Sequence, residues 1–335
     1  MCGCALEDLS KFTLPASHAL GTGLISQPRP TAYRAPLLLC QYNPTMRPPF
    51  EWKVRSRSLK LGERTLIMGI VNVTPDSFSD GGEFFEPGRA VEHALALLAE
   101  GADILDVGGE STRPGKKDPV SAEEEKRRVL PVINGIRKQV RDAIISVDTY
   151  KADTAEAACD CGADIINDVS GLTWDDRMSH LLAASDCGCV LMHTRGRPEE
   201  WRDLPSLAAE EVLPLVSEGL RDIVQRAVNA RIARDRIVLD PGFGFGKRME
   251  ENFPLLGRLA ELHQLGLPLL SGTSRKSFVA RMPAHAIDGS SRLAGSIAAM
   301  TASILAGAHI ARVHDVKEAV AAAKVADAVL NSQCA

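Results

Sequence analysis

Eight short apolar segments, each followed by a longer helix-like segment, alternate along the chain from Leu66 onward. No other feature constrains the fold as strongly. The apolar segments are continuous runs rather than alternating patterns, which is typical of parallel strands covered by helices. The predicted strands are Leu66–Val73, Asp103–Gly109, Ala143–Thr149, Ala163–Gly171, Gly188–His193, Arg236–Gly244, Leu267–Ser274 and His309–Asp315.

Glycines support the same division of the chain. Gly101, Gly162, Gly266 and Gly307 each stand where a predicted helix should end, a position that favours glycine. Eight strand–helix units in about 280 residues match the size of a (β/α)8 barrel. A doubly wound sheet usually has fewer strands and a glycine-rich turn after the first, and no such turn follows Leu66–Val73. We therefore predict the α/β class and a single (β/α)8 TIM barrel over residues 51–335.

Residues 1–50 differ from the rest of the chain. They hold seven of the 19 prolines and six charged side chains, without a helical or strand period. We predict a disordered N-terminal extension, and Met46 would itself make a sensible start for the barrel. A secretory signal peptide fits poorly, because no basic segment precedes an apolar stretch of the required length.

Composition excludes several classes of protein. A formal charge of −4 argues against a nucleic-acid partner. No run of 18 apolar residues is present, which argues against a membrane span. The eight cysteines are scattered, as in a reducing, cytoplasmic location. Cys159/Cys161 and Cys187/Cys189 fall in successive helix-to-strand connections, so both pairs should lie at the amino-terminal end of the barrel. A zinc site of these four thiols is an alternative, although C-x-C spacing is poor for zinc.

Polar side chains stand at the carboxyl ends of the predicted strands, where a barrel of this kind has its active site. One such residue alone is explained as well by a helix cap or a turn. Their convergence on one face instead predicts a ligand site. The residues are Asn72, Glu110, Ser111, Thr112, Arg113, Asp148, Asn167, His193, Asp240, Ser271, Ser274, Arg275, Lys276, Ser277, Arg312 and His314.

These side chains suit two kinds of chemistry. Asp148, Asp240 and Asn167 are acceptors and donors for a flat, nitrogen-rich heterocycle. A second set consists of cations and donors for a diphosphate or a carboxylate: Arg312, His314, Thr112, Lys276 and Arg113. The site polarity therefore predicts a ligand with an amidine-like ring at one end and negative charge at the other.

The segment "LDPGFGFGK" (Leu239–Lys247) has glycines at alternate positions and lacks the spacing of a P-loop. One interpretation is that its backbone approaches a ligand while Phe243 or Phe245 presents an aromatic face. A glycine-rich turn with a phenylalanine in the core explains the pattern equally well.

Eight motifs in a fixed order carry a resemblance to a known family. They are "NVTPDSFSDGG", "GGESTRPG", "SVDT", "INDVSG", "LMH", "LDPGFGFGK", "SRKSF" and "RVHDV". Together they resemble dihydropteroate synthase, a folate-pathway enzyme, from about Arg64 to the C-terminus. The resemblance implies a (β/α)8 barrel, a homodimer and Mg²⁺. It also implies that (7,8-dihydropterin-6-yl)methyl diphosphate condenses with 4-aminobenzoate, giving 7,8-dihydropteroate and diphosphate.

The resemblance also assigns roles to residues. The pterin diphosphate would be bound by Thr112, Asp148, Asn167, Met192, Asp240, Lys276, Arg312 and His314. The 4-aminobenzoate would lie near Arg113, Pro114, Phe245, Lys276 and Ser277. The catalytic residues would be Asp148, Lys276 and Arg312, and Asn72 would reach Mg²⁺. The loop Thr74–Glu86 would close over the diphosphate, and His193 would be structural.

Two alternatives remain on the same barrel. A pterin-dependent methyltransferase would need similar acidic and amide side chains around the ring, but it has no use for "NVTPDSFSDGG" or "SRKS". A non-catalytic pterin-binding relative would lose loop residues that this chain keeps, namely Asn72, Thr112, Arg113, Lys276 and Ser277.

Overall fold

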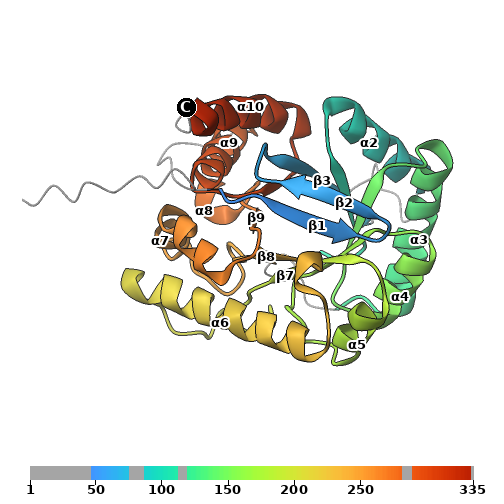
Figure 1. Cartoon of the computed structure of the whole chain (residues 1–335), viewed down its shortest axis with the longest axis horizontal. Coiled ribbons are helices and arrows are strands. Elements are labelled where there is room, and N and C mark those ends of the chain that lie inside the picture. Colours follow the sequence, from blue (N-terminus) through green and yellow to red (C-terminus); the bar gives the residue numbers. More distant parts are fainter. Residues whose placement is uncertain (1–46, 75–86, 112–118, 281–288, 333–335) are drawn as a thin grey trace, which may run out of the picture. The chain divides into compact units, whose positions relative to one another are not determined.

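The computed structural model describes residues 47–74, 87–111, 119–280 and 289–332 (Figure 1). Eight parallel strands are hydrogen-bonded in the order β8-β7-β6-β5-β4-β3-β10-β9. Leu239 pairs with Leu269 across the remaining gap, so the sheet closes on itself. The predicted (β/α)8 barrel is confirmed. Its strands are β3 (Leu66–Asn72), β4 (Ile104–Gly108), β5 (Ile144–Asp148), β6 (Ile165–Asp168), β7 (Gly188–Met192), β8 (Ile237–Asp240), β9 (Leu270–Ser271) and β10 (Ile310–Val313).

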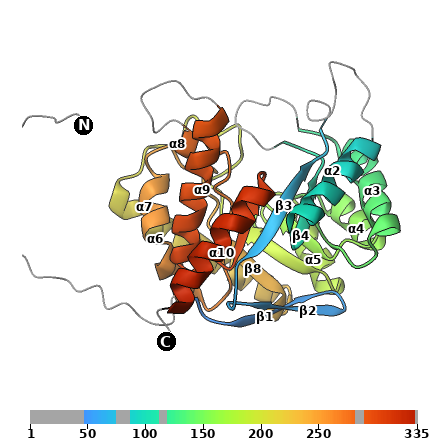
Figure 2. The same ribbon diagram turned by 90° about the horizontal axis from the view of Figure 1, so that it is seen from above.

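Helices surround the strands (Figures 1 and 2). They are α2 (Pro87–Glu100), α3 (Ala122–Gln139), α4 (Ala152–Asp160), α5 (Arg177–Ala184), α6 (Ala209–Asn229), α7 (Asn252–Gly257), α8 (Ser277–Ala280), α9 (Gly289–Leu305) and α10 (Val316–Ser332), with 3-10 turns η1 (Arg234–Arg236) and η2 (Leu259–Leu265). The four glycines predicted to end helices all have positive φ, as expected of αL caps. None of the helices in the described ranges is long and apolar enough to cross a membrane.

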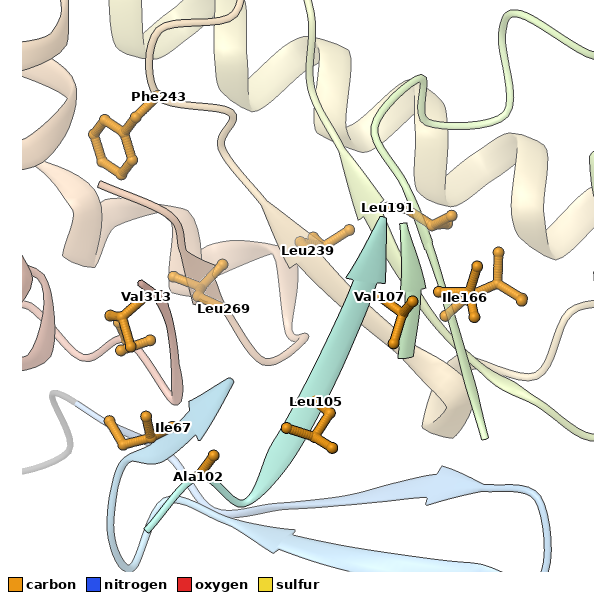
Figure 3. Packing of buried hydrophobic residues seen from close by; sticks show 14 of the residues in the cluster. Ile67, Ala102, Leu105, Val107, Ile166, Leu191, Leu239, Phe243, Leu269 and Val313 are labelled. Carbon is orange, nitrogen blue, oxygen red and sulfur yellow. The ribbon is translucent and has the colours of Figure 1, made fainter. Parts of the chain in front are cut away.

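Alternate residues of each strand face opposite sides of the sheet, which produces two separate cores. Outward-facing Leu105 and Val107 pack with the surrounding helices (Figure 3). Inward-facing Ile104 joins Met68 and Ile310 in a smaller cluster inside the barrel. This register directs every second side chain of a strand into the barrel interior, including those near the carboxyl ends.

A β-hairpin, which was not predicted from the sequence, closes the amino-terminal end of the barrel. It consists of β1 (Phe50–Val54) and β2 (Arg57–Leu61), paired antiparallel. Trp52 is fully buried against the inner cluster, and its Nε1–H donates a 2.9 Å hydrogen bond to the Arg236 carbonyl. The alternation in "FEWKV" was the available signal.

The chain is bound to the barrel from the first residue described. Arg47 Nη1 lies 2.7 Å from Asp327 Oδ1 on α10 and 2.8 Å from Thr65 Oγ1. Residues 47–50, which we had placed in the extension, therefore contact the barrel. The rest of the predicted extension lies outside the described residues.

Candidate active site

The register of the strands brings inward-facing polar residues of neighbouring strands together. Gly108 on β4 pairs with Asp148 on β5, and Asp148 pairs with Asn167 on β6. Farther round the sheet, Met192 on β7 pairs with Asp240 on β8. Asp148 and Asn167 thus lie in one row of the sheet, and Met192 and Asp240 lie one inward-facing row nearer the carboxyl ends, because Asn167 pairs with Val190.

Arg312 on β10 connects the two sides of this interior. Its Nη2 donates a 2.6 Å hydrogen bond to Asp148 Oδ2, and its Nε donates a 2.6 Å bond to Asp106 Oδ2. The same Asp106 oxygen accepts a 3.1 Å bond from Asn167 Nδ2. One guanidinium group is therefore shared by two carboxylates, and the carboxamide of Asn167 is oriented by one of them.

Asp106 was not among the residues predicted from the sequence. This residue is fully buried on β4, and its Oδ1 has no hydrogen-bond partner in the part of the chain described. An isolated acidic residue inside an otherwise apolar strand was the signal, because an unpaired buried charge is costly. The unpartnered oxygen faces the same interior as Asn167 and provides a further acceptor for a ligand.

Burial and neighbouring charges shift the pKa values of Asp148 and Arg312. Burial raises the pKa of Asp148 to about 7, with a contribution from the charge of Asp106, although Arg312 opposes the shift. Burial alone would lower the pKa of Arg312, but the two carboxylates raise it. Arg312 thus stays charged, while Asp148 changes protonation state near neutral pH.

Asp240 is held by the glycine-rich segment that follows it. Its Oδ1 accepts a 2.7 Å bond from the Gly242 amide, and burial raises its pKa. Gly242, Gly244 and Gly246 have φ of 67°, 78° and 67°, which side chains rarely adopt. A Cβ on Gly242 would lie 2.0 Å from the His193 carbonyl oxygen, so close backbone approach requires glycine.

The two phenylalanines of this segment lie in different surroundings. Phe243 is buried in the core and stacks on Phe278, with ring centroids 6.0 Å apart. Phe245 is half-buried, and Lys276 Nζ lies 4.0 Å from its ring centroid. Phe245 is therefore the aromatic residue beside the polar cluster.

Lys247 holds the glycine-rich segment Leu239–Lys247 in place through hydrogen bonds to backbone carbonyls. Its Nζ is buried and donates to the carbonyls of Gly242 at 2.8 Å, Phe245 at 3.2 Å and His193 at 3.4 Å. Burial lowers the pKa of Lys247 to about 7. The position of the Phe245 ring therefore depends on a buried lysine.

The segment after β9 is joined to the end of β10. Ser274 Oγ lies 3.1 Å from His314 Nδ1, and Arg275 Nε donates a 3.1 Å bond to Asp315 Oδ2. Arg275 has a φ of 56°, a strained conformation for a non-glycine residue. These contacts bring Lys276, the exposed Ser277 and His314 to the same rim of the barrel.

Comparison with known proteins identifies the family. A profile described as "Pterin binding enzyme" matches residues 68–314. Dihydropteroate synthase of Escherichia coli K12 is 44% identical over 269 residues, covering 80% of this chain and 92% of the relative. The chain belongs to the dihydropteroate synthase family.

Solved structures of family members share the fold. The Xanthomonas albilineans enzyme with 4-aminobenzoic acid has a TM-score of 0.74 at 42% identity, covering 83% of this chain and 98% of that one. The Yersinia pestis enzyme with a sulfonamide drug has a TM-score of 0.76 at 39% identity, covering 84% and 100%.

Some family-motif residues anchor loops instead of facing the interior. Glu110 forms an ion pair with Lys151, and its Oε1 accepts a 3.3 Å bond from the Val120 amide. Lys151 also lies 3.2 Å from the buried Glu125. Glu110 thus holds the backbone just before α3, at Val120. Thr112, Arg113 and Pro114 lie outside the described residues, as does the loop from residue 75 to 86.

Two residues at predicted strand ends, Ser271 and His193, do not belong to the interior cluster. The prediction for Ser271 was wrong, because its side chain donates to Ser303 Oγ on α9 at 2.8 Å. His193 is buried against Gly219 on α6, and burial holds its pKa well below the usual value. The structural role expected of His193 agrees with this placement.

Proposed function

We propose that this dihydropteroate synthase family member joins (7,8-dihydropterin-6-yl)methyl diphosphate to 4-aminobenzoate, forming 7,8-dihydropteroate and diphosphate. The observation that carries the proposal is the interior cluster in which Arg312 bridges Asp106 and Asp148 beside Asn167. A pterin ring presents alternating donors and acceptors along its amino–imino edge. Paired carboxylates and a carboxamide, held in a dry interior, complement such an edge.

The ring would lie between two groups of side chains. Asp148, Asn167 and Asp240 would bind its nitrogen-rich edge, with the unpartnered Asp106 oxygen as a further acceptor. Met192 would pack against the ring face, and Lys276 would contact the ring from the rim. The Asp148 pKa near 7 allows this carboxyl group to accept or donate a proton at a ring nitrogen.

The diphosphate would lie toward the rim, bound by Arg312, His314 and Thr112. Asn72 ends β3 with a half-buried carboxamide, an oxygen donor of the kind Mg²⁺ accepts. No cluster of three or more His, Cys, Asp or Glu suited to a metal occurs among the described residues. Asn72 would contribute its carboxamide oxygen to Mg²⁺, and the ion would supply positive charge for the leaving diphosphate.

The chemistry needs no protein nucleophile. The C–O bond to the diphosphate breaks, and its electron pair leaves with the diphosphate. The electron-rich dihydropterin stabilises the methylene cation, and the anionic form of Asp148 assists through its charge. The neutral amine of 4-aminobenzoate then forms the C–N bond and loses a proton. Positioning of the two substrates supplies the remaining rate enhancement.

The 4-aminobenzoate would lie against Phe245 and Lys276, with its carboxylate near Ser277 and with Arg113 and Pro114 completing the site. Lys276 Nζ lies 4.0 Å from the centroid of the Phe245 ring, so a positive charge and an aromatic ring stand together, a combination suited to an aromatic acid. Lys247 would keep that surface in place through its carbonyl contacts.

We also propose a cytoplasmic homodimer. Val325 and Val329 on α10 are 65% and 42% exposed and lie one helical turn apart, as a subunit contact would require. Neither the location nor the dimer is needed for the chemistry above.

The proposal is tested by incubating the full chain with the dihydropterin diphosphate and Mg²⁺, with and without 4-aminobenzoate. We expect diphosphate release that requires 4-aminobenzoate and equals the dihydropteroate detected by mass spectrometry. Pterin binding without any diphosphate release would instead favour a non-catalytic relative. Methyl transfer from a methylated pterin to a corrinoid would favour the methyltransferase.

A further inference from the structure

Two cysteines lie in contact at the end of the barrel opposite the proposed active site. Cys159 belongs to the last turn of α4, and Cys187 immediately precedes β7. Their Sγ atoms are 3.0 Å apart, although 28 residues separate them along the chain. Cys159 is half-buried and Cys187 is buried, so the pair opens to solvent through Cys159. Both are free thiols.

Two arginines lie beside the pair. Arg55, on the hairpin turn, donates a 2.9 Å bond to the Cys159 carbonyl and a 3.0 Å bond to the Ala163 carbonyl. Arg236 Nε donates a 2.9 Å bond to the Cys187 carbonyl. The Cys159 hydrogen bond and the two guanidinium groups lower the pKa of Cys187, against the effect of its burial. Thiolates stabilised in this way are the reactive form of cysteine.

We propose that Cys159 and Cys187 form a reversible disulfide when the protein meets a hydroperoxide. The Cys187 thiolate takes one oxygen atom from the hydroperoxide, giving a sulfenic acid, and the departing alkoxide or hydroxide takes up a proton to leave as an alcohol or water. The Cys159 sulfur then attacks the Cys187 sulfur. The S–S bond forms as the S–O bond breaks, and the departing hydroxide takes the proton of the Cys159 thiol to leave as water. Two thiols are oxidised and one peroxide is reduced.

The neighbouring cysteines differ in ways that make them matched controls. Cys161 lies beyond the end of α4, with its sulfur 3.8 Å from Asn134 Nδ2. Cys189 is buried within β7, where burial raises its pKa to about 12. A structural zinc site usually needs four ligands, and a two-thiol contact does not supply them. The geometry therefore favours one specific pair among the four thiols.

The experiment treats the reduced full chain with increasing hydrogen peroxide, blocks the remaining thiols by alkylation and digests the protein with trypsin without reduction. The expected product joins the peptide Ala152–Arg177 to the peptide Met178–Arg195. Each of these peptides holds two cysteines, so the double variant Cys161→Ser/Cys189→Ser provides the assignment. It should form the link as readily as the unmodified chain, and dithiothreitol should reverse it.

Cys159→Ser should abolish the link, and it is the safer single variant because this position is only half-buried. The link should also raise the unfolding temperature of the oxidised protein, since it closes a loop in the unfolded chain. Full alkylation of Cys159 and Cys187 after peroxide treatment would overturn the proposal. So would a link that disappears in Cys161→Ser/Cys189→Ser. Neither result bears on the proposed activity, because every readout is a thiol or an unfolding temperature.

Discussion

Arg312 Nη2 on β10 donates a 2.6 Å hydrogen bond to Asp148 Oδ2 on β5, which joins two sides of the barrel interior. Between β5 and β10 in the sheet lie β4 and β3, and β4 contributes Asp106 to the same guanidinium. The orientation of the proposed pterin site thus depends on side chains from several strands, none of them on a loop.

Asp106→Asn should impair the pterin site. The variant keeps the shape of the side chain but removes the charge that fixes Arg312 and orients Asn167. We expect kcat/KM for the pterin diphosphate to fall by at least about 10-fold, or ~1.4 kcal/mol. Steady-state kinetics would measure the loss, with the exposed Asp222→Asn as the matched control. Unchanged kinetics in Asp106→Asn would contradict the role given to this residue.

Asp148 should make stability depend on pH. Its pKa is raised to about 7 in the folded chain, against about 3.9 for an unfolded aspartate. Between these values the folded state holds a proton that the unfolded state has lost, so the free energy of unfolding should fall as pH rises from about 4 to about 7.

Urea unfolding at a series of pH values in this window would measure the effect. The decline should be shallower in Asp148→Asn, because the variant has no proton to release there, while Asp222→Asn should follow the unmodified chain. An identical pH dependence in Asp148→Asn and the unmodified chain would show that the Asp148 pKa is not raised in the folded chain.

Phe245→Leu should weaken the binding of 4-aminobenzoate without affecting the pterin diphosphate. The variant keeps apolar volume but removes the aromatic face beneath Lys276. We expect the KM for 4-aminobenzoate to rise about 10-fold, in line with the loss of stacking and cation–π contacts. The KM for the pterin diphosphate should stay within about 2-fold. Phe253→Leu, at the partly exposed Phe253 on α7, is the matched control. An equal effect on both substrates would count against this assignment.

Trp52→Ala should destabilise the barrel by removing the contact between the β1–β2 hairpin and the barrel interior. Trp52 is fully buried, and its indole N–H is bonded to the Arg236 carbonyl. We expect the free energy of unfolding to fall by about 3–5 kcal/mol, as for other buried tryptophans. Urea denaturation would measure the fall. A change below about 1 kcal/mol would mean that the hairpin adds little to the stability of the barrel.

Sequence patterns predicted the barrel because its strands follow one another in space as they do along the chain. Asp148, Asn167, Asp240 and Arg312 could be predicted because strand ends in a barrel meet at one face. Each of these positions is also inward-facing by the alternation of its strand. Ser271 does not belong to the site, because Leu270 is the inward-facing residue of β9 and Ser271 therefore faces α9, where it bonds to Ser303.

Other features depend on partners distant in the chain. A buried Asp106 is tolerated because Arg312, 206 residues later, neutralises it. For the β1–β2 hairpin the sequence offered only the short alternation in "FEWKV", and the barrel end that it covers is seen only in the structure. Phe243 and Phe245 each stand between two glycines in the sequence, and only the structure shows that Phe243 lies in the core and Phe245 beside Lys276.

The most direct test of the central claim is the rate of dihydropteroate formation by Arg312→Lys. The variant keeps a positive charge but cannot bridge Asp106 and Asp148 or present a planar group to a diphosphate. We predict a fall in kcat/KM of at least about 100-fold, or ~2.7 kcal/mol, whereas the exposed Arg221→Lys on α6 should match the unmodified chain. Dihydropteroate formation by Arg312→Lys within about 2-fold of the unmodified rate would contradict the account.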